Sequence, residues 1–362
     1  METEPKKEIP NLPLEISEKT HEELSALFEG REWNGEKFPP VFLKLFSGAH
    51  ETAKDADGIK PLLDESDIYV PEIFGWSRNG LSILRKISSG EHFDFVESDE
   101  FGDKVEEYFF NTNKPIIIID VPEREVLSNQ ETYGEAELYV RKLKRFSYEE
   151  AVERIFEYLE ESAKFDVVNR EAYMTEHFSE QIKKIIKEYP ELQKKDAIKV
   201  LMTLGSGHIS IYHALKEIGG GHVSRDFHST SNRGYGSEGI TRVSFGKEIS
   251  EELKERALLE SIFLDGMKHL LDRVSKNSLK NEYFLRYIIS LFSRDEIKDV
   301  FEQWKGYEDD PVEILYFIIM KKGIVFPKTE EEMDAILTTT PYGKYQKTLQ
   351  EIKEKREKNR NE

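Results

Sequence analysis

The chain has 362 residues, of which 38% are hydrophobic and 34% charged, and its formal net charge is −19. This charge argues against nucleic acid and anionic membrane surfaces as partners, because binding to phosphate groups needs a surplus of Lys and Arg. The chain contains no cysteine, which excludes disulfides, zinc–thiolate sites and thiol nucleophiles.

No segment has the features of a secretory signal or a membrane span. Residues 1–20 are acidic and interrupted by proline, and they lack an apolar core. The longest apolar runs, such as 314–320, are too short to cross a bilayer. We therefore expect a cytoplasmic protein without a membrane partner.

Strand-like and helix-like patterns alternate along the first two thirds of the chain. Short apolar runs, typical of strands buried in a parallel sheet, occur at 41–46, 67–72, 114–122 and 198–204. Segments with helical spacing lie between or after them, at 51–63, 81–87, 99–110, 148–162, 167–189 and 209–218. This alternation predicts an α/β fold with a mostly parallel sheet flanked by helices.

The pattern changes after this region. Residues 221–245 are polar and rich in Gly and Ser, which predicts a long loop that acts as a lid or contacts substrate. From Ser250 onward, helical spacing returns. We expect four parts: an N-terminal arm (1–36), an α/β domain (37–248), a helical accessory region (249–325) and a charged C-terminal tail (326–362).

Two of the predicted strands run into the same kind of turn. Strand 41–46 is followed by Ser47-Gly48-Ala49-His50, and strand 198–204 by Gly205-Ser206-Gly207-His208. Ligands of an open α/β sheet bind at the carboxyl ends of its strands, so His50 and His208 are expected to meet there. Gly48, Gly205 and Gly207 would let the backbone approach a ligand closely. Each histidine either caps or packs at its own turn, or the two imidazoles together make a metal site or an acid–base pair.

Two carboxylates end other predicted strands. Glu72 follows the second strand, and Asp120 follows the isoleucine-rich third one. Each is either a capping or surface carboxylate, or a ligand or general base beside the histidines. Glu72 ranks first because it lies one strand after His50.

An arginine and a further histidine complete the set of candidate residues. Met174 and Phe178 lie at i+4 and i+8 from Arg170, which places Arg170 on the buried stripe of its helix. It either extends past the helix end or fixes a site carboxylate and stabilises an oxyanion. His228 is either an ordinary loop residue or a contributor to the lid. The chain shows no P-loop, GxSxG, HExxH or GxGxxG motif, which leaves chemistry based on a metal or on water.

The order of these motifs resembles the superfamily that joins TraB/PrgY pheromone-shutdown proteins, Tiki metalloproteases, erythromycin esterase-like enzymes and the ChaN haem-binding lipoproteins. The resemblance covers about 40–245 and rests on Gly48-Ala49-His50, Tyr69-Val70-Pro71-Glu72, Arg170-Glu171-Ala172-Tyr173-Met174 and Gly205-Ser206-Gly207-His208. The chain departs from the family pattern at Ser47, where a Gly is usual, and at Glu171, where Asp or Asn is usual.

The resemblance implies an α/β domain with two pseudo-symmetric halves and a site at the strand ends. By similarity, His50, Glu72 and His208 would be metal ligands or acid–base residues, and Arg170 would supply a supporting charge.

The predicted function is that of a metal-dependent hydrolase acting on an amide or ester bond. A divalent metal such as manganese, cobalt or zinc would be held by His50, Glu72 and His208, with Arg170 or His228 stabilising the oxyanion. The alternatives are a non-catalytic protein that binds a peptide, haem or metal, and a metal-free esterase that uses His and Glu. We expect a small-molecule or peptide substrate, and assembly into a homo-oligomer stays open.

Overall fold

The structure is a computed structural model that describes residues 14–48, 56–92, 100–133, 138–205, 208–227, 234–276, 278–307 and 311–340. The chain forms two compact units, the first from 1–136, 160–231 and 240–248, and the second from 137–159, 232–239 and 249–362. The second unit thus includes two segments, 137–159 and 232–239, that lie within the predicted α/β domain (37–248).

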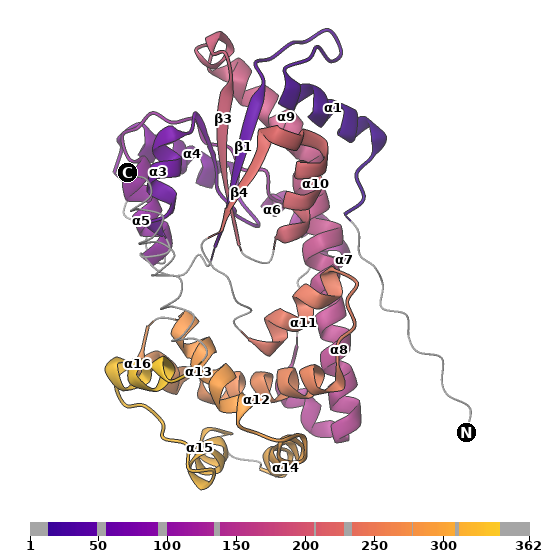
Figure 1. Ribbon diagram of the computed structural model, residues 1–362, viewed down its shortest axis with the longest axis vertical. Helices are drawn as coiled ribbons and strands as arrows, with labels where there is room; N and C mark the ends of the chain where they lie inside the picture. Colours follow the sequence, from indigo (N-terminus) through magenta and orange to yellow (C-terminus); the bar gives the residue numbers. More distant parts are fainter. Residues whose placement is uncertain are drawn as a thin grey trace, which may run out of the picture. The chain divides into compact units, whose positions relative to one another are not determined.

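The first unit is built on a parallel sheet with the strand order β2-β3-β1-β4. Figure 1 labels β1, β3 and β4. Its strands are β1 (Val41–Gly48), β2 (Ile68–Val70), β3 (Ile198–Gly205) and β4 (Val223–Phe227). β1 pairs with β3 from Val41↔Ile198 to Gly48↔Gly205, so both predicted glycine turns begin at the same edge of the sheet. The predicted α/β class with a parallel sheet flanked by helices is confirmed.

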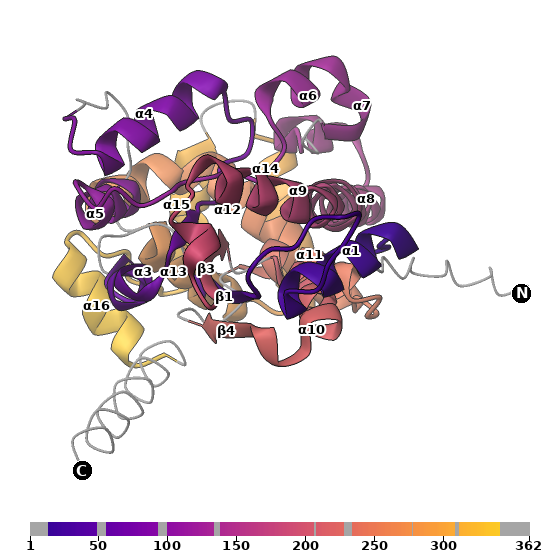
Figure 2. The ribbon, with the colours of Figure 1, turned by 90° about the horizontal axis from the view of Figure 1, so that it is seen from above.

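Helices cover both faces of this sheet, as Figure 2 shows from above. One core forms where α1 (Glu18–Glu29), α9 (Ala172–Glu188) and α10 (Ile209–Gly219) pack on side chains such as Leu43, Leu45 and Val200. The other forms where α3 (Ile59–Glu65), α4 (Arg78–Ser88) and α5 (Glu100–Phe109) pack on Phe46, Tyr69 and Leu201. Burial on both faces explains why these strands read as nearly continuous apolar runs.

Part of the segment predicted as an N-terminal arm is a core helix. The Ser17 side chain caps α1 by accepting a hydrogen bond from the N–H of Thr20. Leu24, Leu27 and Phe28 recur at helical spacing and are buried in the core of the first unit. Burial of this apolar face holds residues 18–29 on the domain.

The isoleucine-rich segment is extended and lies beside β2 without forming a full strand. The N–H of Tyr69 donates to the carbonyl of Pro115 at 3.0 Å, and the N–H of Ile117 donates to the carbonyl of Tyr69 at 3.1 Å. Ile116 to Ile119 are buried. This short ladder is enough to deliver Asp120 to the carboxyl edge of the sheet, as the sequence predicted.

The prediction of one long loop over 221–245 is wrong. Residues Val223–Phe227 form β4, which pairs with β1 from Leu43↔Val223 to Ser47↔Phe227, and Tyr235–Ser244 form helix α11. β4 is an edge strand, so a single buried side chain such as Val223 can anchor it while its polar residues face outward. That polar composition hid the strand.

Several short elements link the larger ones. They are α6 (Glu123–Ser128), α7 (Gln130–Tyr133), η1 (Val140–Arg145), η2 (Phe165–Glu171), η3 (Leu192–Lys194) and η4 (Gly220–His222). Helix α8 (Tyr148–Lys164) continues directly into η2 and α9, and the boundary between the two units falls within α8.

The second unit is helical. It contains α12 (Glu251–Val274), α13 (Ser278–Ser290), α14 (Arg294–Lys305), α15 (Pro311–Lys321) and α16 (Glu330–Thr338). Its core includes Phe263, Phe284, Phe301 and Trp304, and α16 lies in the segment predicted as a charged tail. Across the described parts of both units, no helix is long and apolar enough to cross a membrane.

Candidate functional site

Five charged or titratable side chains from four separate segments meet at the carboxyl edge of the sheet. Glu72 follows β2, and Asp120 follows the extended segment beside β2. Arg170 and Glu171 end η2, and His208 directly precedes α10. We call these five residues the edge cluster.

Arg170 lies at the centre of the edge cluster and binds both strand-end carboxylates. Its Nε donates to Asp120 Oδ1 at 3.0 Å and its Nη2 to Asp120 Oδ2 at 2.6 Å, a two-point ion pair. Nη2 also donates to Glu72 Oε1 at 2.7 Å. The sequence placed Arg170 on a buried stripe that required a partner, and these two carboxylates are its partners.

Asp120 is itself held in place from both its backbone and its side chain. The indole Nε1 of Trp76 donates to the Asp120 carbonyl at 2.7 Å, and the N–H of Val121 donates to Asp120 Oδ1 at 2.8 Å. With its side chain 1% exposed, Asp120 acts as a buried anchor for the guanidinium of Arg170.

Arg170 and Glu171 end a π-helical turn, η2, that interrupts an otherwise continuous helix. π turns use i→i+5 hydrogen bonds and occur mostly as short interruptions of α-helices, frequently at functional sites. The next turns of α9 bury Met174 and Phe178 completely. That packing fixes the end of η2 against the sheet and presents both charged residues to its edge.

Glu171 connects His208 to the first turn of α10. Its Oε1 lies 3.3 Å from His208 Nδ1, and its Oε2 accepts a hydrogen bond from the N–H of Ile211 at 2.6 Å. The first N–H groups of a helix lack partners within the helix, so a carboxylate there satisfies a free donor. Glu171 therefore fixes both the start of α10 and the orientation of the imidazole that precedes it.

The other nitrogen of His208 faces the rest of the edge cluster. His208 Nε2 lies 3.0 Å from Glu72 Oε1 and 3.1 Å from Arg170 Nη1. A protonated imidazole donates from Nε2 to Glu72 and from Nδ1 to Glu171. A neutral imidazole that keeps its proton on Nδ1 accepts at Nε2 from Arg170. Nε2 of His208 therefore has a hydrogen-bond partner whether the imidazole is protonated or neutral.

The electrostatics of the edge cluster favour positive charge on its basic groups. Burial lowers the pKa of His208, but the charge of Glu72 and the hydrogen bonds with Glu171 and Glu72 outweigh it, so the pKa lies well above 6.5. Burial also lowers the pKa of Arg170. The hydrogen bonds to Asp120 and the charges of Glu72 and Asp120 outweigh that effect, so the pKa of Arg170 is raised. Burial raises the pKa of Glu171, and the hydrogen bonds from His208 and Ile211, which lower it, offset this only in part.

Gly205 lets Glu72 approach the backbone. The N–H of Gly205 donates to Glu72 Oε2, and a Cβ at Gly205 would lie 3.3 Å from that oxygen. A larger residue would push the carboxylate away from His208. The close approach predicted for this glycine is therefore made to a side chain of the site, and Gly48 lies opposite it on β1.

Ser47 is a buried hydroxyl at the end of β1. It is 1% exposed, and its Oγ has no hydrogen-bond partner among the residues that the structure describes. It lies opposite Leu204 on β3, beside the pair Gly48↔Gly205. Buried hydroxyls without a partner are uncommon in folded proteins, so Ser47 is a candidate contact for a ligand.

The structure brings together Glu72, Asp120, Arg170 and His208 as the sequence predicted, with Gly205 beside them. Three further candidates, His50, Gly207 and His228, lie outside the described residues.

Glu171 was not predicted as a site residue. The sequence does contain a pattern that indicates this role. Glu171 precedes Met174 by three residues and Phe178 by seven, so it lies on the same buried stripe. A carboxylate on such a stripe must have a partner.

The donors of the edge cluster do not form a metal site by themselves. No three His, Asp or Glu side chains are grouped to hold a metal ion anywhere in the described ranges. Glu72 and His208 offer two donors, but Arg170 nitrogens lie 2.7 Å from Glu72 Oε1 and 3.1 Å from His208 Nε2. A divalent ion bound to these donors would lie beside a guanidinium that already supplies the opposing charge.

Comparison with known proteins gives no family for this chain. No protein-family model, curated protein or solved structure matches it.

Proposed function

We propose that the edge cluster is the active site of a hydrolase that cleaves an ester or amide bond, with Glu72 and His208 as the acid–base pair and no metal required. The contact that carries this proposal joins His208 Nε2 to Glu72 Oε1 at 3.0 Å, with Arg170 beside both atoms. The resemblance to erythromycin esterase-like enzymes is compatible with this chemistry.

Exposure divides the edge cluster into reacting and supporting residues. The side chains of Glu72, Arg170 and His208 are 14%, 11% and 7% exposed, whereas those of Asp120 and Glu171 are 1% and 0% exposed. We assign the reaction to the three that solvent reaches. Asp120 and Glu171 are positioning residues that orient Arg170 and His208.

The proposed reaction begins with water attacking the carbonyl carbon of the substrate. Glu72 accepts a proton from this water as the new carbon–oxygen bond forms, and Arg170 Nη1 donates a hydrogen bond to the resulting oxyanion. The raised pKa of His208 keeps its imidazole protonated near neutral pH.

His208 then donates its Nε2 proton to the leaving oxygen or nitrogen as the bond between the carbonyl carbon and that atom breaks. The proton on Glu72 passes to His208 across the 3.0 Å contact, which restores the starting state. The products are a carboxylic acid and an alcohol or amine.

The test is hydrolysis of a panel of nitrophenyl esters and of short peptide amides by the purified protein. We expect Glu72→Gln and His208→Gln to lower kcat by about 10²–10⁴-fold, the usual contribution of general acid–base groups. His213→Gln is the matched control, since His213 is an exposed residue of the same helix α10. It should retain full activity.

Two results would contradict the proposal. One is equal turnover by His208→Gln and the wild type. The other is tight binding of substrates without any turnover, which would instead support the non-catalytic binding alternative.

A further inference from the structure

A pocket of the first unit lies between α4, the extended segment beside β2 and α9. It has a volume of about 300 Å³ and is lined in part by Trp76, Leu81, Ile117, Ile118 and Ile185. Glu72, Arg170 and His208 do not line it. We call it the α4–α9 pocket.

The charged residues of the α4–α9 pocket are mainly cationic. Arg78, Arg85 and Lys184 line it together with a single carboxylate, Glu188. Arg85 already has partners, because its Nη2 lies 3.4 Å from Glu188 Oε2 and its Nε donates to the Ile116 carbonyl. Arg78 and Lys184 have no carboxylate partner among the residues that the structure describes. Both side chains are exposed, so their charges are available to a ligand that enters the pocket.

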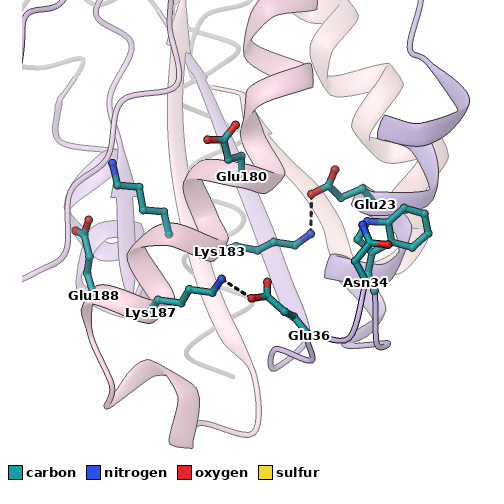
Figure 3. A pocket seen from close by; sticks show the side chains of 9 residues that line it. Glu23, Asn34, Glu36, Glu180, Lys183, Lys187 and Glu188 are labelled. Atoms are coloured by element: carbon teal, nitrogen blue, oxygen red, sulfur yellow. Dashed lines mark hydrogen bonds and ion pairs between the residues drawn. The ribbon is translucent and has the colours of Figure 1, made fainter.

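The neighbouring pocket in Figure 3 provides a contrast. It has a volume of about 530 Å³ and shares Lys184 and Glu188 with the α4–α9 pocket. Its other lysines are already neutralised, because Lys183 pairs with Glu23 at 2.7 Å and Lys187 with Glu36 at 2.6 Å (Figure 3). In the α4–α9 pocket, an anionic ligand would pair with Arg78 and Lys184 in place of solvent.

We propose that the α4–α9 pocket binds a small organic anion, in which a carboxylate or phosphate group is attached to an apolar body. Arg78 and Lys184 would bind the oxyanion. The apolar body would contact Trp76, Leu81 and the isoleucines. The volume lies at the lower end of the range for ligand pockets, which limits the ligand to a small molecule.

Trp76 links the α4–α9 pocket to the edge cluster. Trp76 lines the α4–α9 pocket, and its indole donates to the carbonyl of Asp120, which anchors Arg170. The two sites share no charged side chain, so anion binding does not depend on the proposed hydrolase activity.

The test is isothermal titration calorimetry of the full chain with phenyl phosphate, benzoate, inorganic phosphate and the neutral benzyl alcohol. We expect phenyl phosphate and benzoate to bind more tightly than inorganic phosphate, and benzyl alcohol not to bind. Arg78→Ala and Lys184→Ala should each weaken the binding of phenyl phosphate about tenfold, which corresponds to about 1.4 kcal/mol.

Lys183→Ala and Lys187→Ala are the matched controls, because they remove neighbouring lysines of α9 that already have partners. Both should bind phenyl phosphate as the wild type does. Absence of binding to the wild type, or equal weakening in all four variants, would overturn the proposal. Binding should persist in His208→Gln, so failure of the hydrolase proposal can be recognised separately.

Discussion

Glu171 accepts a hydrogen bond from the N–H of Ile211 at 2.6 Å, and through that contact one buried carboxylate fixes the first turn of α10. The other oxygen of the same carboxylate lies 3.3 Å from His208 Nδ1. The position of His208 and the proton affinity of its ring therefore depend on a residue that solvent does not reach.

Replacing Glu171 with Gln should lower the pKa of His208. The amide oxygen can still accept from Ile211, but the side chain no longer carries the charge that stabilises the imidazolium. NMR titration of the His208 ring should show the drop, and the alkaline limb of the pH–rate profile should move to lower pH. Glu176→Gln, on an exposed face of α9, should leave both unchanged. An unchanged ring pKa in Glu171→Gln would contradict this role.

The raised pKa of His208 also predicts how stability depends on pH. The folded protein binds this proton more tightly than the unfolded chain, whose imidazole titrates near 6.5. The contribution is complete below about pH 6.5 and is lost as pH rises through the folded-state pKa. We expect the free energy of unfolding, measured with urea at a series of pH values, to fall on the alkaline side. The decline should be shallower in His208→Gln, and an equal decline in both proteins would count against it.

Arg170→Ala should destabilise the first unit strongly. It leaves the carboxylate of Asp120, 1% exposed, without its countercharge, and breaking a buried ion pair in this way costs about 3–5 kcal/mol. Urea denaturation would measure the loss. Lys60→Ala, which removes the exposed pair between Lys60 and Asp64 in α3, should cost less than about 1 kcal/mol. Similar losses in the two variants would show that Arg170 is not an electrostatic anchor.

Ser47→Ala should separate stability from activity. Removing a buried hydroxyl that has no partner in the described part of the chain should leave the protein as stable as the wild type or more stable, by up to about 1–3 kcal/mol. If Ser47 contacts the substrate, kcat/KM should fall about tenfold at the same time. Thr203→Val provides the contrast, because its hydroxyl is bonded to Tyr69 at 3.1 Å and its loss should destabilise. A less stable Ser47→Ala variant would contradict the assignment.

Chelation should not abolish hydrolysis. The guanidinium of Arg170 already counters Glu72 and lies beside His208, so dialysis against EDTA should leave kcat within about twofold of its starting value. Metal content should be measured by mass spectrometry on the same samples. Activity that disappears with the chelator and returns with manganese, cobalt or zinc would restore the metal-dependent prediction, with His50 as the first ligand to test.

Residues whose position is fixed by strand ends could be predicted from the sequence. Glu72 and Asp120 end apolar runs, and His208 follows a Gly-containing turn, so the parallel arrangement alone brings them to one edge. Arg170 could be predicted from its place on a buried helical stripe. Their mutual contacts could not, because hydrogen-bonding distances depend on how α9 packs against the sheet.

Local composition gave wrong predictions for elements that bury only one face. β4 reads as polar because it is an edge strand anchored by Val223, and α1 was included in an arm although Leu24 and Phe28 reach the core. Glu171 escaped notice for a different reason. A charged residue on an apolar stripe looks like an interruption until its partner, His208, is brought in from 37 positions later.

The π-helical turn at Phe165–Glu171 has a consequence for finding relatives of this chain. A turn with i→i+5 bonds contains one residue more than the α-helical turn that it replaces. A relative with an unbroken helix would therefore be shorter by one residue within Phe165–Glu171. Alignments that forbid gaps inside helices would place Arg170 and Glu171 one column out of register. Searches for this site should allow a single-residue gap there.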